Sequence, residues 1–155
     1  MFRDLRRIAQ KLSNAENIEI LQQQNTGILA VIGDGGYPYT VPLNFVYESG
    51  NIFIHCAKQG HKIDAISKES KVSFCVVAKD DVNAPKFSTD YKSVVVFGKA
   101  TLLESDDEKI DVLTKIVQKY SPQFTQQGKK EIDEFISQTA IIKIEIEHIT
   151  GKRSK

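Results

Sequence analysis

The chain has 155 residues, a formal net charge of +1 and 41% hydrophobic residues. This length suits a single domain, 1–155, in which residues 1–25 read as an N-terminal helical segment. The near-neutral charge excludes the broadly basic surface of nucleic-acid-binding domains. No apolar run approaches the roughly 20 residues that span a bilayer, and no signal-peptide pattern opens the chain, so the sequence predicts a cytoplasmic protein that does not bind a membrane.

The first 25 residues are helical in pattern. From Phe2 to Gln24 apolar residues recur at three- and four-residue steps, and Ser13 or Asn14 can cap a second helix within this range. The glycine of Asn25-Thr26-Gly27 is expected to end that helix.

Strands dominate the next part of the chain. Residues 28–32 are apolar and β-branched, and residues 37–47 alternate after a turn at Asp34-Gly35-Gly36. Pro42 has no N–H to donate, so this strand either loses its pairing there, which frees backbone groups for a ligand, or is simply an edge strand. A turn at Ser49-Gly50-Asn51 leads to a further strand.

The rest of the chain mixes strands and helices. We expect a strand at 52–57, a short helix at 60–67, a strand at 72–78 and a polar loop at 79–90. A long strand at 91–103, with a bulge or a close approach at Gly98, is followed by helices from Asp106 and at 128–136 and by a final strand at 139–149. Six or seven strands without regular β-α alternation argue against a doubly wound sheet. The predicted fold is mainly β: an antiparallel barrel of six to seven strands with peripheral helices.

The most informative short stretch is Gly60-His61-Lys62 at a predicted helix start. Backbone N–H groups and cationic side chains gather there, which is an arrangement that favours phosphate. Dinucleotide-binding, Walker and nucleophile-elbow motifs are absent, so a bound cofactor would have to carry any chemistry. The spacing of the cysteines and histidines matches no usual zinc pattern, and we expect no metal site.

A resemblance to a known family extends over nearly the whole chain. It rests on Gly-Tyr-Pro-Tyr-x-Val-Pro-Leu-Asn-Phe (36–45), Ile-His-Cys-Ala-x-x-Gly-His-Lys-Ile-Asp (54–64), Val-x-Phe (72–74), Tyr-x-Ser-Val-Val-Val-Phe-Gly-Lys-Ala (91–100) and Ile-Thr-Gly-Lys (149–152). Together these segments resemble the pyridoxamine 5′-phosphate oxidase-like flavoproteins, and more narrowly the branch that contains nitroimidazole-resistance proteins.

The resemblance implies an FMN-binding split β-barrel that forms a homodimer with FMN at the interface. Backbone groups of Pro42, Leu43 and Asn44 would meet the flavin ring. The ring and ribityl chain would lie near His55, Cys56 and Ala57, the phosphate near Gly60, His61 and Lys62, and a further contact near Ser93.

The sequence also departs from the family pattern. Relatives commonly carry arginine at the position of His61, and the arginine-rich C-terminal motif of true pyridoxamine phosphate oxidases is not visible. No residue is assigned a catalytic acid or base role.

Three functions stay open at this point. The first is an FMN-dependent oxidoreductase that passes electrons, with NAD(P)H as a candidate donor, to a small electrophile such as a nitroaromatic or nitroimidazole compound. The second is a non-enzymatic flavin-binding or redox-sensing module. The third is a haem-binding relative with His55 or His61 as axial ligand.

Overall fold

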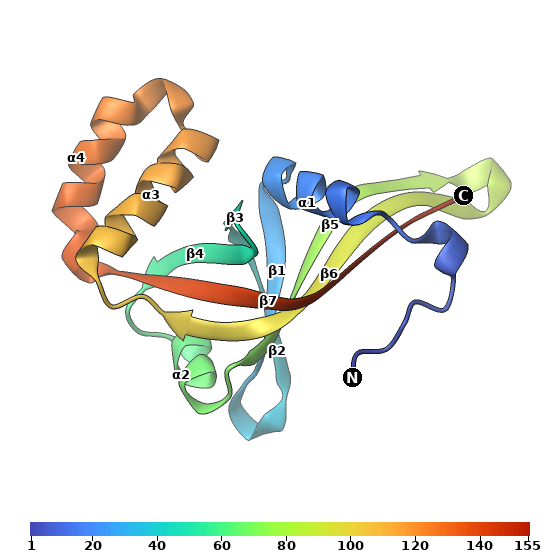
Figure 1. The fold of residues 1–155 in the computed structure, drawn as a ribbon, viewed down its shortest axis with the longest axis horizontal. Coiled ribbons are helices and arrows are strands. Elements are labelled where there is room, and N and C mark those ends of the chain that lie inside the picture. The colour runs from blue at the N-terminus through green and yellow to red at the C-terminus, as the bar shows by residue number, and fades with distance from the viewer.

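The computed structural model describes all 155 residues, and its seven strands form one antiparallel sheet in the order β2-β1-β5-β6-β7-β4-β3. The strands are β1 (Thr26–Ile32), β2 (Pro38–Asn44), β3 (Val46–Glu48), β4 (Asn51–Ala57), β5 (Lys71–Asn83), β6 (Ser88–Leu102) and β7 (Thr139–Arg153). The helices are α1 (Asn14–Gln23), α2 (His61–Lys68), α3 (Asp106–Tyr120) and α4 (Thr125–Phe135). The sheet curls so that β2 and β4, at or near its two ends, come close to each other without pairing. The curled antiparallel sheet with its peripheral helices confirms the predicted barrel (Figure 1).

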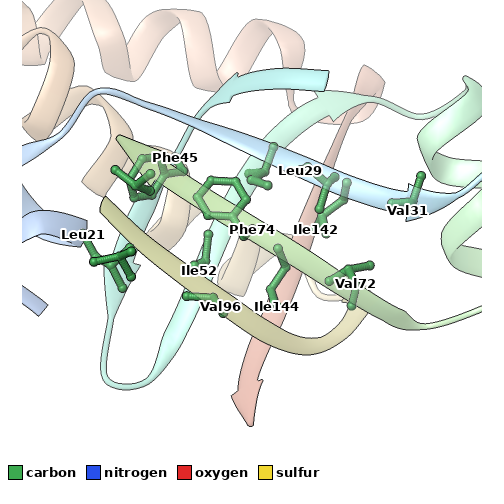
Figure 2. Close-up of a cluster of buried hydrophobic side chains, with 14 of the residues drawn as sticks. Leu21, Leu29, Val31, Phe45, Ile52, Val72, Phe74, Val96, Ile142 and Ile144 are labelled. Carbon is green, nitrogen blue, oxygen red and sulfur yellow. The ribbon is translucent and has the colours of Figure 1, made fainter. Parts of the chain in front are cut away.

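Alternating side chains of the strands fill the barrel. Leu29, Phe74 and Ile142 come from three different strands, and each is fully buried. Figure 2 shows Phe45 and Phe74 side by side among the aliphatic side chains, and their ring centroids lie 5.0 Å apart in an edge-to-face arrangement. Burying each such side chain contributes about 1.5–3 kcal/mol.

The N-terminal segment contains one helix and not two. The capping box predicted at Ser13 is present, because its Oγ accepts from the Glu16 N–H while its own N–H donates to the Glu16 carboxylate. Before it, only a 3-10 turn at Ile8–Gln10 forms. The Leu12 N–H donates instead to the Gly151 carbonyl (2.9 Å), so docking along β7 replaces the predicted first helix.

Gly27 does not end a helix; it lies inside β1. A Cβ at this position would stand 2.1 Å from Cζ of Phe74, so the close approach of this ring requires glycine.

The expected polar loop at 79–90 is also wrong. β5 and β6 continue their ladder to Asn83 and Ser88, with Pro85 confined to the 3-10 turn at the tip. Lys79 forms ion pairs with Asp81 and Asp90 along this arm. Cross-strand pairing thus continues both strands through a polar stretch whose sequence lacks hydrophobic alternation. The arm projects from the barrel at the end opposite the α3–α4 hairpin (Figure 1).

The α3–α4 hairpin covers the outside of the barrel beside β3, β4 and β7. Val46 and Ile141 are buried there against Ile116 and Ile132 and form a second, smaller core. At Gly98 the predicted close approach is confirmed, since a Cβ there would stand 2.4 Å from the Glu145 carbonyl oxygen. The register also shifts beside it, and the extra residue of this bulge lies on β7. None of the helices combines the length and apolarity that a membrane crossing requires.

Candidate functional site

The barrel splits where β2 gives way to β3. The ladder between β3 and β4 ends at the pair Val46–Phe53, and β2 turns away to pair with β1. Phe45, between the two strands, has no backbone partner. The facing edges of β2 and of residues 54–57 of β4 are therefore free, and we call the opening between them the fork.

Pro42 does not interrupt the pairing of β2. The register to β1 runs without a shift from Asn44 through Pro42, opposite Ile28, to Pro38. The edge-strand interpretation is thus the right one. The groups available to a ligand are those on the side of β2 that faces β4.

The start of α2 offers unpaired donors. Gly60 precedes the helix at φ 145°, a conformation suited to glycine, and no atom lies within 4 Å of the place where a Cβ would stand. The first backbone bond of the helix runs from the Asp64 N–H to the Gly60 carbonyl (3.1 Å). The N–H groups of His61, Lys62 and Ile63 therefore have no acceptor within the helix.

Lys62 adds an unpaired positive charge at the same place. It takes part in no ion pair. Burial raises the pKa of the Cys56 thiol, and the charge of Lys62 opposes that rise in pKa, so the ammonium stands close to the end of β4. A cation in the first turn opposes the helix dipole, so an anion bound here would relieve two unfavourable interactions.

His61 is turned toward the loop that precedes β2. Its Nε2 accepts a hydrogen bond from the Asp34 N–H (3.1 Å), and its ring packs on Tyr39 at 4.3 Å between centroids. In this arrangement Nε2 is an acceptor and does not donate to a phosphate. Its predicted phosphate contact stays a prediction that needs this bond to break.

The three residues at the end of β4 point in alternating directions. Cys56 packs against the barrel core. His55 faces the α3–α4 hairpin and lines a cavity of about 260 Å³ together with Ile132 and Phe135. Burial lowers the pKa of His55, which favours the neutral imidazole. Ala57 is exposed at the mouth of the fork.

Ser93 does not join the other predicted residues within one chain. It pairs with Lys152 of β7, whereas Cys56 pairs with Ala140, twelve residues away along the same strand. Twelve strand residues correspond to roughly 40 Å of extended chain. The structure thus places nine of the ten predicted residues on β2, the end of β4 and the start of α2, although the side chain of His55 faces the α3–α4 hairpin and not the fork. Ser93 lies apart from them.

A family model described as pyridoxamine 5′-phosphate oxidase matches residues 13–153. The chain belongs to this family. No curated protein sequence matches it significantly.

Solved structures show the same fold at low sequence identity. A candidate 5-nitroimidazole antibiotic resistance protein from Bacteroides thetaiotaomicron aligns with a TM-score of 0.78 and 22% identity, over 92% of this chain and 85% of that one. An FAD- and haem-binding protein from Mycobacterium smegmatis gives 0.81 and 20% identity, over 94% and 73%. An FAD-binding protein from Mesorhizobium loti gives 0.68 and 23%, over 94% and 98%.

Two residues of this pyridoxamine 5′-phosphate oxidase family member contact the fork although the sequence predicted no role for them. Lys119 and Tyr120 end α3, and both reach the backbone at the fork. In the sequence they read as the ordinary last turn of a helix before Ser121-Pro122, and only the tertiary structure shows what they contact.

Proposed function

We propose that the protein is an FMN-binding oxidoreductase that works as a homodimer. The observation that carries this proposal is the position of Lys62, an unpaired cation beside three free backbone N–H groups, directly next to the two unpaired strand edges of the fork. A flat ring with a phosphorylated side chain matches this combination, since its anionic end and its polar ring edge each find donors or acceptors.

Lys62 and the start of α2 are proposed to hold the phosphate. A charge pair at about 4 Å near a protein surface has a gross attraction of roughly 4 kcal/mol, of which desolvation cancels a large part. The open space beside Gly60 allows a phosphate to approach the backbone closely. The helix dipole strengthens the attraction.

The ring is proposed to lie along the free edge of β2. Pro42, Leu43 and Asn44 present backbone groups there, with the end of β4 at Cys56 and Ala57 on the other side. Val41 and Leu43 of β2 are half-buried against the barrel core, and Ile54 of β4 is fully buried. This packing is proposed to hold both edges in place and so to fix the orientation of the ring.

When bound, FMN supplies hydride and electron transfer, here proposed from NAD(P)H to a small electrophile such as a nitroaromatic compound. In this proposal the chain's own residues bind and orient the cofactor. The names of the similar structures, which include a nitroimidazole-resistance protein and flavin-binding proteins, support this class of cofactor and acceptor.

The outward face of the sheet supports the proposed homodimer. One row across it consists of Pro42, Ile28, Cys75, Val95 and Thr150, without a charge. Ile28 is 40% exposed and Val77, toward Ser93, is 50% exposed. An apolar sheet face of this kind marks an interaction surface. We propose that a second copy covers this face and places the partner's Ser93 near the fork.

A spectrum of the purified protein tests the cofactor. We expect flavin bands at about 370 and 450 nm, against a haem band near about 400 nm, and chromatography of the released compound distinguishes FMN from FAD. Lys62→Ala should raise the Kd for FMN about tenfold to a hundredfold. The control Lys68→Ala removes the same charge from the other end of α2 and should leave the Kd unchanged. A colourless protein that does not bind added FMN would refute the proposal.

Two further measurements separate the remaining alternatives. Turnover of a nitro compound with NADH or NADPH distinguishes an enzyme from a flavin store or redox sensor. Light scattering should show that Ile28→Glu is a monomer, and this variant should also bind FMN more weakly. The control Phe124→Glu introduces the same charge at a 60% exposed position on the helical hairpin and should stay dimeric.

A further inference from the structure

Phe45 is where the barrel opens, and its backbone is satisfied only by side chains. Its N–H donates to the hydroxyl of Tyr120 (2.9 Å), and its carbonyl accepts from Nζ of Lys119 (2.9 Å) and from the Tyr120 hydroxyl (2.8 Å). Without these partners, the buried N–H and carbonyl of Phe45 would either stay unpaired, which lowers the stability of the fold, or form hydrogen bonds with a neighbouring strand.

The same two side chains tie down the connection between α1 and β1. Lys119 Nζ donates to the Gln24 carbonyl (2.7 Å), and the Tyr120 hydroxyl lies 2.6 Å from the Asn25 carbonyl. That carbonyl also accepts from the side chain of Asn44 (2.9 Å), a residue at the proposed flavin edge. The end of α3 thus connects to β2 both directly and through Asn25.

The Lys119 ammonium has no acidic partner, so its role is not that of a surface ion pair. Its Nζ lies 4.1 Å from the centre of the Phe45 ring, which is fully buried. Two carbonyls and an aromatic face are the groups that hold it. Such a contact fixes both the backbone and the ring of Phe45.

The alternative pairing that these contacts oppose can be derived from the register. Continuing the β3–β4 ladder past Val46–Phe53 would place Phe45 opposite Ile54 and Asn44 opposite His55. That pairing would close the fork and cover the free edge of β2.

We infer that Lys119 and Tyr120 are positioning residues of the flavin site, which hold Phe45 against α3 and keep the fork open. The inference rests on the proposed flavin binding, and it concerns residues that lie outside the segments expected to touch the cofactor.

Tyr120→Phe and Lys119→Met test it, with two readouts. Without flavin, the amide of Phe45 should exchange with deuterium about tenfold faster in Tyr120→Phe, since it has lost its acceptor. With flavin, each variant should raise the Kd for FMN about tenfold, and Lys119→Arg should restore most of the affinity because it keeps a charged donor.

Matched controls exclude a general loss of stability. Tyr47→Phe removes a hydroxyl that also accepts from a backbone N–H, that of Gly50 (3.2 Å), but outside the fork. Lys115→Met removes a lysine one turn earlier on α3, which pairs with Glu48 and Asp111. Both should bind FMN as the wild type does.

The outcomes separate this inference from the proposed function. If the wild type binds FMN and both fork variants bind it equally well, the inference is wrong and the proposed function stands. If the wild type binds no flavin, the proposed function is wrong, and so is the positioning role of the two residues toward flavin. If the Phe45 amide exchanges at the wild-type rate in Tyr120→Phe, the inference that Tyr120 holds Phe45 against α3 is wrong as well.

Discussion

Gly27→Ala should destabilise the barrel by about 2 kcal/mol. The added methyl group would stand 2.1 Å from Cζ and 2.2 Å from Cε1 of Phe74, about 1.5 Å closer than a normal carbon contact. Phe74 is fully buried against Phe45, so its ring cannot rotate away freely. Overpacking of this kind costs about 1–3 kcal/mol, offset in part by the lower chain entropy of alanine.

Thermal unfolding of the flavin-free protein measures this effect. Each 1 kcal/mol shifts the melting temperature of a domain of this size by about 2–4 °C, so we expect a decrease of about 4–8 °C. Thr26→Ala, at an exposed neighbouring position, should change the stability by less than about 0.5 kcal/mol. Combining Gly27→Ala with Phe74→Leu, which removes the obstructing ring, should cost less than the sum of the two single changes. Strictly additive effects, or an unchanged melting temperature in Gly27→Ala, would refute the steric argument.

Three other predictions follow from polar and titratable groups. Burial lowers the pKa of Lys119 from 10.5 to about 8, so between these pH values the unfolded chain binds more protons than the folded chain and stability increases with pH. In urea unfolding, the wild type should therefore gain about 1–2 kcal/mol of stability relative to Lys119→Met from pH 7.5 to 10, a value reduced for the partial exposure of the lysine. The absence of this gain would contradict the pKa shift. Ser13→Ala should lower the free energy of unfolding by about 1 kcal/mol, because α1 loses its capping box, and an unaltered urea midpoint would argue against that contribution. Burial raises the pKa values of Cys56 and Cys75, so a thiol reagent at pH 7.5 should label the native protein more slowly than the urea-unfolded chain, and equal rates would show that both thiols are accessible and unperturbed.

Local patterns predicted the elements whose stability depends on nearby residues. The turn at Ser49-Gly50 forms with both residues at positive φ, and α2 begins directly after Gly60, one residue later than the sequence indicates. The alternation in β7 correctly places Ile142 and Ile144 inside. In each case the decisive interaction lies within the element or on one face of it, so a sequence pattern of period 2 or 3.6 contains the information.

Elements that depend on distant partners were missed. Leu12 has a helical spacing but docks on Gly151, and residues 79–90 look like a loop but pair across the arm. The site shows the same limit. The glycine and lysine at the start of α2 are visible as a local motif, whereas Tyr120 acts on Phe45, 75 residues earlier in the chain. No spacing rule connects two such positions, because the contact exists only after the sheet has closed.

The break at Phe45 links the fold of the barrel to its proposed site. Phe45 and Val46 are consecutive and both buried, yet consecutive strand residues point to opposite faces. Burial of both is achieved because Phe45 fills the barrel while Val46 packs under α3 and α4 in the second core. In this arrangement β2 keeps β1 as its partner and β4 keeps β7. Both cores are filled while the facing edges of β2 and β4 stay unpaired, and these free edges are the ones that the proposed flavin would occupy.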